Sequence, residues 1–171
     1  VYSGQDLDIS NIGGDLRFEG NQASNSAGAF GVSGSLNLNN VGSITFINNH
    51  ADNTYAVGWV SKDWNVTNTG DITISGNSSD KQMGGVAVFG NTTFITVEGN
   101  STKGSNGALR FYGTFSVTDA GNISLSGNSA DQYNGAIEVT GNTSFTRTGN
   151  ISMDNNTAGW HYGVGQFHRD L

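Results

Sequence analysis

The chain has 171 residues, of which 26 are glycine and none is proline or cysteine, and 35% of its residues are apolar. Without cysteine it can form neither a disulfide nor a thiolate metal site. Its formal charge of −7, with only seven scattered lysines and arginines, argues against nucleic acid or an anionic membrane as a partner.

The first predicted element covers residues 2–12. Its pattern matches that of residues 33–41, which lie one repeat further along the chain. The chain is therefore expected to open partway through a repeating unit, and after Phe167 it is expected to stop partway through another.

The next predicted element is a strand that ends at an asparagine, with the form apolar-x-apolar-x-x-Asn. This segment occurs six times and ends at Asn21, Asn49, Asn77, Asn100, Asn128 and Asn156. The intervals are 28, 28, 23, 28 and 28 residues. A fixed period of this length predicts stacked copies of one small unit, that is, a solenoid.

Aligning the six copies on these asparagines gives columns of similar residues. Five positions before the asparagine stand Leu16, Ile44, Ile72, Ile95, Ile123 and Ile151. Three positions before it stand Phe18, Phe46, Ile74, Val97, Leu125 and Met153. The intervening residue is always polar, as in Arg17, Thr45 and Ser124. This alternation is typical of a half-buried strand whose apolar side chains face a core.

Asparagine suits this corner because it tolerates left-handed backbone conformations and its amide both donates and accepts hydrogen bonds. Copies stacked at roughly 4.8 Å predict a hydrogen-bonded asparagine ladder along the axis. The residue before each asparagine also has turn chemistry, being Gly20, Gly76, Gly99, Gly127, Asn48 or Asn155.

The segment after each asparagine varies most and is predicted to be a turn, at residues 22–27, 50–55, 78–83, 101–106, 129–134 and 157–162. Variable turns on a repetitive scaffold favour recognition, and exposed aromatic side chains suit sugar stacking or protein contact. The predicted partner-contact residues are Tyr55, Tyr133, Trp160 and Tyr162, with Trp59 in an outward column of the next strand. The alternative for Trp160, His161 and Tyr162 is that they cover the last coil as a cap.

Two more strands complete each repeat. One begins seven residues after the asparagine, at Gly28, Ala56, Gly84, Gly107, Gly135 and Gly163, and a weaker one follows, as in residues 36–38 and 143–145. With no amphipathic helical run, the pattern predicts an all-β, single-stranded parallel β-helix over residues 1–171, with about six coils of three short strands each. The 23-residue interval is explained by the loss of five turn residues between Phe94 and Ile95.

The repeat also carries a family resemblance, in the pattern Phe-x-x-Asn followed by Gly-Gly-Ala-aliphatic. It is seen in residues 18–21 with 27–30, and its second half is kept in residues 106–109 and 134–137. Over nearly the whole chain this resembles the repeats of chlamydial polymorphic outer-membrane proteins and related bacterial autotransporter passengers. The resemblance implies a right-handed β-helix that is displayed at the cell surface and used for adhesion.

The sequence therefore predicts a non-catalytic extracellular module of the bacterial surface, with no cofactor, no metal and no direct membrane insertion. Its expected partner is a protein or glycan of a host or neighbouring cell. The main competing hypothesis is a structural rod whose uncapped coil ends bind further copies head to tail and form extracellular filaments. Two more functions fit the pattern less well. A polysaccharide-active enzyme needs convergent carboxylates, which the columns do not provide, and an ice-binding protein needs more regular threonine ranks.

Overall fold

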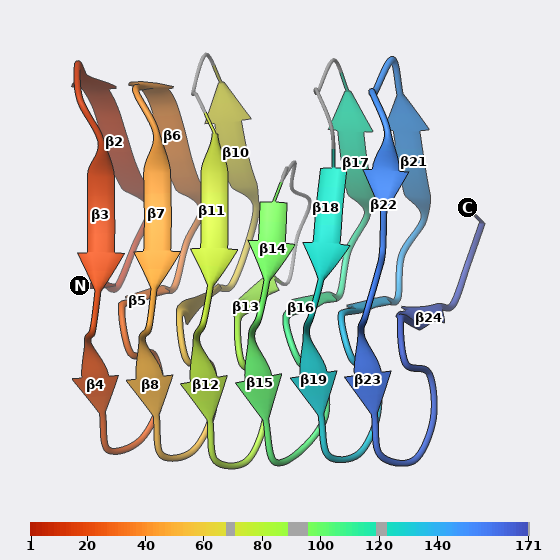
Figure 1. Cartoon of the computed structure of the whole chain (residues 1–171). Helices are drawn as coiled ribbons and strands as arrows, with labels where there is room; N and C mark the ends of the chain where they lie inside the picture. The colour runs from red at the N-terminus through yellow and green to blue at the C-terminus, as the bar shows by residue number, and fades with distance from the viewer. Residues whose placement is uncertain (68–70, 89–95, 119–122, 171) are drawn as a thin grey trace.

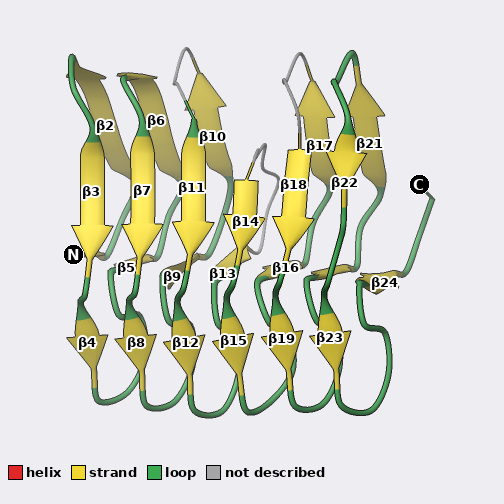
Figure 2. Cartoon of the chain, in the orientation of Figure 1, coloured by secondary structure: helices red, strands yellow, loops and turns green. Residues whose placement is uncertain are grey.

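The computed structural model describes residues 1–67, 71–88, 96–118 and 123–170, and it is a parallel β-solenoid (Figures 1 and 2). The described residues form no helix, and hence none long and apolar enough to cross a membrane. In Figure 1 the near strands run downward, the far strands run upward, and successive coils step from left to right, which is a right-handed winding. The predicted fold class is confirmed.

Each coil passes in turn through four sheets, here named A to D. Sheet A contains β1 (Tyr2–Ser3), β5 (Phe30–Val32), β9 (Gly58–Val60), β13 (Val86–Val88), β16 (Leu109–Phe111), β20 (Ile137–Val139) and β24 (Gly165–Phe167). Sheet B contains β2 (Leu7–Ile12), β6 (Leu36–Val41), β10 (Trp64–Thr67), β17 (Phe115–Thr118) and β21 (Thr143–Thr146). Sheet C contains β3 (Leu16–Glu19), β7 (Ile44–Ile47), β11 (Ile72–Ser75), β14 (Thr96–Glu98), β18 (Ile123–Ser126) and β22 (Ile151–Ser152).

Each coil also contributes a strand to sheet D, which makes a fourth strand in addition to the three that the sequence predicts. Sheet D contains β4 (Gln22–Ala23), β8 (His50–Ala51), β12 (Ser78–Ser79), β15 (Ser101–Thr102), β19 (Ser129–Ala130) and β23 (Thr157–Ala158). These residues are the first two of each predicted variable turn. The second residue of each is small and faces inward, as Ala51, Ser79 and Ala130 do, so the chain stays extended and pairs with its neighbours before it turns.

The apolar columns of sheet C fill the core, as predicted. Ile44, Ile72 and Ile123 are at most 2% exposed, and Phe46, Ile74 and Leu125 are equally buried. Ile151 is 42% exposed because its strand, β22, is paired on one side only. Ile95 and the side chain of Val97 lie outside the described residues, as does the predicted five-residue deletion. The register across that deletion is nevertheless kept, with Thr73 opposite Thr96 and Ile74 opposite Val97.

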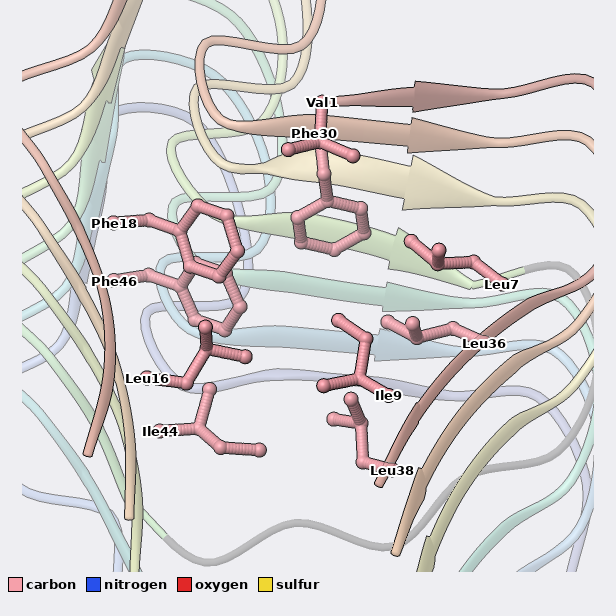
Figure 3. Close-up of a pocket in the computed structure, with 10 residues that line it drawn as sticks. All are labelled: Val1, Leu7, Ile9, Leu16, Phe18, Phe30, Leu36, Leu38, Ile44 and Phe46. Carbon is pink, nitrogen blue, oxygen red and sulfur yellow. The ribbon is translucent and has the colours of Figure 1, made fainter. Parts of the chain in front are cut away.

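The first coil leaves the core open at its end. Figure 3 shows the side chains that line this apolar cavity of about 60 Å³, namely Val1, Leu7, Ile9, Leu16, Phe18, Phe30, Leu36, Leu38, Ile44 and Phe46. Phe18 stacks on Phe46 with ring centroids 5.0 Å apart. The same packing of rings and aliphatic side chains continues into the closed coils, where Trp64 is fully buried.

The asparagine ladder is confirmed, and it has a direction. The side-chain Nδ2 of each asparagine donates to the Oδ1 of the asparagine in the next coil, at 2.8 to 3.1 Å, from Asn21 through to Asn156. The same Oδ1 also accepts the backbone N–H of the preceding ladder residue. Asn49, Asn77, Asn100 and Asn128 are fully buried, so the ladder is part of the core.

One detail of the predicted corner is wrong. The left-handed backbone belongs to the residue before each ladder asparagine, not to the asparagine itself. Gly20, Asn48, Gly76, Gly99, Gly127 and Asn155 all have φ between 54° and 64°. The preceding residue makes the turn, so the ladder residue is free to point its amide along the axis.

A second left-handed column lies six residues after each ladder asparagine, with φ between 55° and 65° at Ala27, Tyr55, Met83, Asn106, Asn134 and Tyr162. Here Asn134 Nδ2 donates to Asn106 Oδ1 at 3.0 Å. Asn134 Oδ1 is buried and accepts no hydrogen bond from the described residues. Non-glycine residues other than Asn and Asp adopt this conformation at a cost of about 1–2 kcal/mol.

Replacing Tyr162 with asparagine is expected to raise the free energy of unfolding by about 1–2 kcal/mol. The new residue tolerates the left-handed backbone, and its amide can donate to the unpaired Asn134 Oδ1. Tyr162→Gly is the matched control, since it relieves the backbone and supplies no amide. Denaturant unfolding of both variants checks this, and an asparagine variant no more stable than the glycine variant would refute the added hydrogen bond.

Candidate recognition face on sheet A

The five predicted partner-contact residues do not form one cluster. Three of them, Tyr133, Trp160 and Tyr162, come together in the last coils. The Tyr133 ring packs edge-on against Trp160, with ring centroids 5.3 Å apart, and stacks on the His161 ring at 5.7 Å. The His161 ring also lies 5.8 Å from the Tyr162 ring. Trp160 is 60% and Tyr162 49% exposed. This aromatic cluster therefore lies at the surface of the last coils, a position that fits both the cap interpretation and the recognition interpretation.

Trp59 lies on the outer face of sheet A, as predicted, and is half-exposed. Its indole covers Gly31, where a Cβ atom would lie 3.1 Å from Trp59 Nε1, and it meets Tyr2 edge-on at 6.4 Å. Glycine in the neighbouring coil thus makes room for the indole. Trp59 is separated along the axis from the Tyr133 cluster.

Tyr55 lies four residues before Trp59 in the same coil and is half-buried. Burial raises the pKa of its phenol above the ordinary value, the neighbouring Tyr112 raises it further, and Arg110 lowers it. Tyr55 is therefore within electrostatic range of a group of residues, including Arg110 and Tyr112, that the repeat pattern did not single out.

The strand register explains that group. The outward positions of sheet A are aligned across successive coils, with Arg110 opposite Glu138 and Glu138 opposite Gln166. Arg110 and Glu138 are one 28-residue repeat apart. Aligning the outward positions of the second strand would have revealed this pair of opposite charges, so the signal was present in the sequence.

These side chains form a charged cluster on the outer face of sheet A. Arg110 Nε lies 3.1 Å from Glu138 Oε2, and His168 Nε2 lies 3.4 Å from Glu138 Oε1. The Arg110 guanidinium also stacks over the Tyr112 ring, 4.5 Å from its centroid. Glu138 is only 9% exposed. A carboxylate this buried needs a charged partner, and Arg110 supplies one.

Two hollows flank this ion pair. The first, which we call the axial groove, has a volume of about 260 Å³ and is lined by Gln82, Ser105, Asn106, Arg110, Tyr133, Asn134, Glu138 and Gln166. The second has a volume of about 520 Å³ and is lined by Tyr112, Gly113, Thr114, Thr140, Gly141, Asn142 and Arg169. Arg110 lines the first hollow and stacks on Tyr112 of the second, so the pair connects them. We call the two hollows and the pair the recognition face.

A Ser–His–Asp contact on sheet D has part of the geometry of a catalytic triad. His50 Nδ1 lies 2.9 Å from Ser78 Oγ, and His50 Nε2 lies 3.3 Å from Asp52 Oδ1. The imidazole of such a chain could act as a base toward the serine, but acyl transfer also requires N–H groups that stabilise an oxyanion. The N–H of Ser78 donates to Asn49 O and that of Asp80 to Ala51 O. These two backbone donors are therefore committed to the solenoid.

Three other carboxylates of the described residues also pair with surface groups. Glu19 pairs with Arg17, Asp15 accepts from Ser43, and Asp154 accepts from Ser152. Within the described ranges, no group of three or more His, Asp or Glu side chains could hold a metal ion. The recognition face itself presents hydrogen-bonding side chains, tyrosine rings and an ion pair.

Comparison of the chain with protein-family models, with curated proteins and with solved structures finds no match. The resemblance to polymorphic outer-membrane proteins accordingly rests on the repeat motifs alone.

Proposed function

We propose that this chain is a non-catalytic recognition module of an extracellular bacterial surface protein, which binds a glycan or protein of another cell through the recognition face. The observation that carries this proposal is the Arg110–Glu138 pair, with its buried carboxylate, between two tyrosine-bordered hollows. Sheet C, by contrast, presents short polar side chains such as Thr45 and Thr73 in a repetitive column. A paired charge with aromatic neighbours beside a concave surface is a typical recognition element.

The solenoid supports this role by fixing the geometry of the face. Each outward side chain of β16 and β20 stands on a strand that is paired on both sides, and the ladder and the apolar columns lock successive coils in register. Sites on such rigid elements hold their groups in place before a ligand arrives, which lowers the entropic cost of binding.

Binding to intact cells tests the proposal. Fluorescently labelled protein is expected to bind epithelial or bacterial cells saturably in flow cytometry, and the double variant Tyr112→Ala/Tyr133→Ala is expected to bind about tenfold more weakly, because it loses both aromatic borders. The matched control is Thr45→Ala/Thr73→Ala, on the outer face of sheet C. Absence of saturable binding, or equal loss in both variants, would overturn the proposal.

Head-to-tail self-association is a second candidate, favoured by the open apolar cavity of the first coil and by the direction of the asparagine ladder. The strand order opposes simple stacking. If β2, β3 and β4 of one copy continued β21, β22 and β23 of another, β1 and β24 would occupy the same layer of sheet A. Sedimentation velocity with negative-stain microscopy over a hundredfold concentration range separates the candidates, since concentration-dependent filaments would favour the second.

A further inference from the structure

We infer that the axial groove binds a neutral, hydroxyl-rich carbohydrate. This inference rests on the proposed recognition function and names the ligand class of the same face. It follows from the charge balance of the groove, from its hydrogen-bonding groups and from the setting of Tyr133.

The charge balance disfavours strongly charged ligands. The only charged side chains that line the described groove are Arg110 and Glu138, and they neutralise each other at 3.1 Å. An anionic ligand would have to draw Arg110 away from a buried carboxylate, and a cationic ligand would have to draw Glu138 away from Arg110. The chain's overall charge of −7 further disfavours anionic sugars.

The hydrogen-bonding groups match sugar hydroxyls. Within the described part of the chain, the side-chain amides of Gln82 and Gln166 make no hydrogen bond, and both line the groove. An amide offers a donor and an acceptor side by side, and the Glu138 carboxylate adds acceptors. Sugar hydroxyls donate and accept at once, so they can satisfy such a mixed set without any change in charge.

The aromatic wall of the groove is held in place before a ligand binds. Tyr133 is the one aromatic side chain among the described groove residues, and it is fixed between Trp160 and His161. A fixed ring can stack on the apolar face of a pyranose with little further loss of side-chain freedom. A peptide strand, by contrast, would need an open sheet edge, and the sheet A strands at this position, β16 and β20, are paired on both sides.

Calorimetric titration with defined hexasaccharides tests the inference. The probes are cellohexaose, maltohexaose, mannohexaose, xylohexaose and chitin hexamer as neutral ligands, with hexagalacturonate and chitosan hexamer as anionic and cationic ligands. At least one neutral probe is expected to bind at least tenfold more tightly than either charged probe. Tighter binding of a charged probe, or no binding of any neutral probe, would overturn the inference.

Substitutions in the axial groove test whether the hexasaccharides bind there. Tyr133→Ala and Gln166→Ala are each expected to weaken binding of the best neutral probe about tenfold, whereas Thr73→Ala on sheet C should leave it unchanged. Glu138→Gln leaves Arg110 uncompensated, so it is expected to shift the preference toward hexagalacturonate. Gln166 is half-exposed and makes no side-chain hydrogen bond in the described part, so its variant keeps the test valid if Glu138→Gln fails to fold.

The cell-binding assay distinguishes failure of this inference from failure of the proposed function. Cell binding that depends on Tyr112 and Tyr133 but is not inhibited by any neutral hexasaccharide would refute the ligand class and leave the recognition function standing. Hexasaccharide binding in the groove without binding to any cell would refute the recognition function and leave the ligand class standing.

Discussion

Replacing Ile72 with aspartate is expected to destabilise the protein by about 4 kcal/mol or more, which is a large part of the total stability of a domain this size. Ile72 is 1% exposed, pairs in register with Ile44 and lies in the apolar core. An aspartate there would be buried without a cationic partner, and the lost apolar contacts would add to that cost. Denaturant unfolding followed by far-ultraviolet circular dichroism measures the effect.

Two matched variants separate burial from a general effect of charge. Thr73→Asp places the same charge on the outer face of the same strand, where Thr73 is half-exposed. Ile151→Asp makes the same substitution in the same column, at a position that is 42% exposed. Both are expected to cost less than about 1 kcal/mol. If Ile72→Asp unfolds at the wild-type midpoint, the inward assignment of the column is incorrect.

The periodic part of this fold could be predicted from the sequence because every coil places similar residues in the same packing environment. Ile44, Ile72 and Ile123 share one column and one environment, so each copy supports the assignment of the others. The ladder was predictable for the same reason. Sheet D was not, because a two-residue strand such as His50–Ala51 is too short to show an alternation.

The position of the left-handed turn shows a different limit. Four of the six residues before the ladder asparagine are glycine, which already indicated where φ is positive. The prediction instead gave weight to the backbone tolerance of asparagine, whereas the invariant feature of the ladder residue is its amide. Side-chain hydrogen bonding selects asparagine at that corner, and backbone conformation selects glycine one position earlier.

The recognition face was harder to predict because it breaks the repeat. Arg110 and Glu138 are unlike Gly31 and Trp59 at the equivalent outward positions of sheet A, so averaging over copies hides them. Their pairing follows from the register. The stacking of Arg110 on Tyr112 and the setting of Tyr133 depend on side-chain packing that no period encodes. Candidate binding residues of a solenoid are thus found among the exceptions to its columns.

Replacing Asn77 with alanine is expected to destabilise the protein by about 3–5 kcal/mol. Asn77 Oδ1 accepts from Asn49 N at 2.8 Å and from Asn49 Nδ2 at 2.9 Å, and Asn77 Nδ2 donates to Asn100 Oδ1 at 2.8 Å and to Phe46 O at 3.0 Å. All three asparagines are fully buried. Alanine would remove all four of these hydrogen bonds, each worth about 0.5–1.5 kcal/mol, and it would leave the buried Asn49 N–H without a partner at a further cost of about 1–3 kcal/mol.

Asn21→Ala is the matched control for this ladder variant, because Asn21 occupies the same corner in the first coil but is exposed to solvent. Water can replace the lost amide there, so the expected cost is below about 1 kcal/mol. Equal destabilisation by the two variants in denaturant unfolding would mean that the corner asparagine acts through its backbone. A large difference would mean that the buried chain of amides holds the coils in register, because the backbone corner is the same at both positions and only the burial and hydrogen bonding of the amide differ.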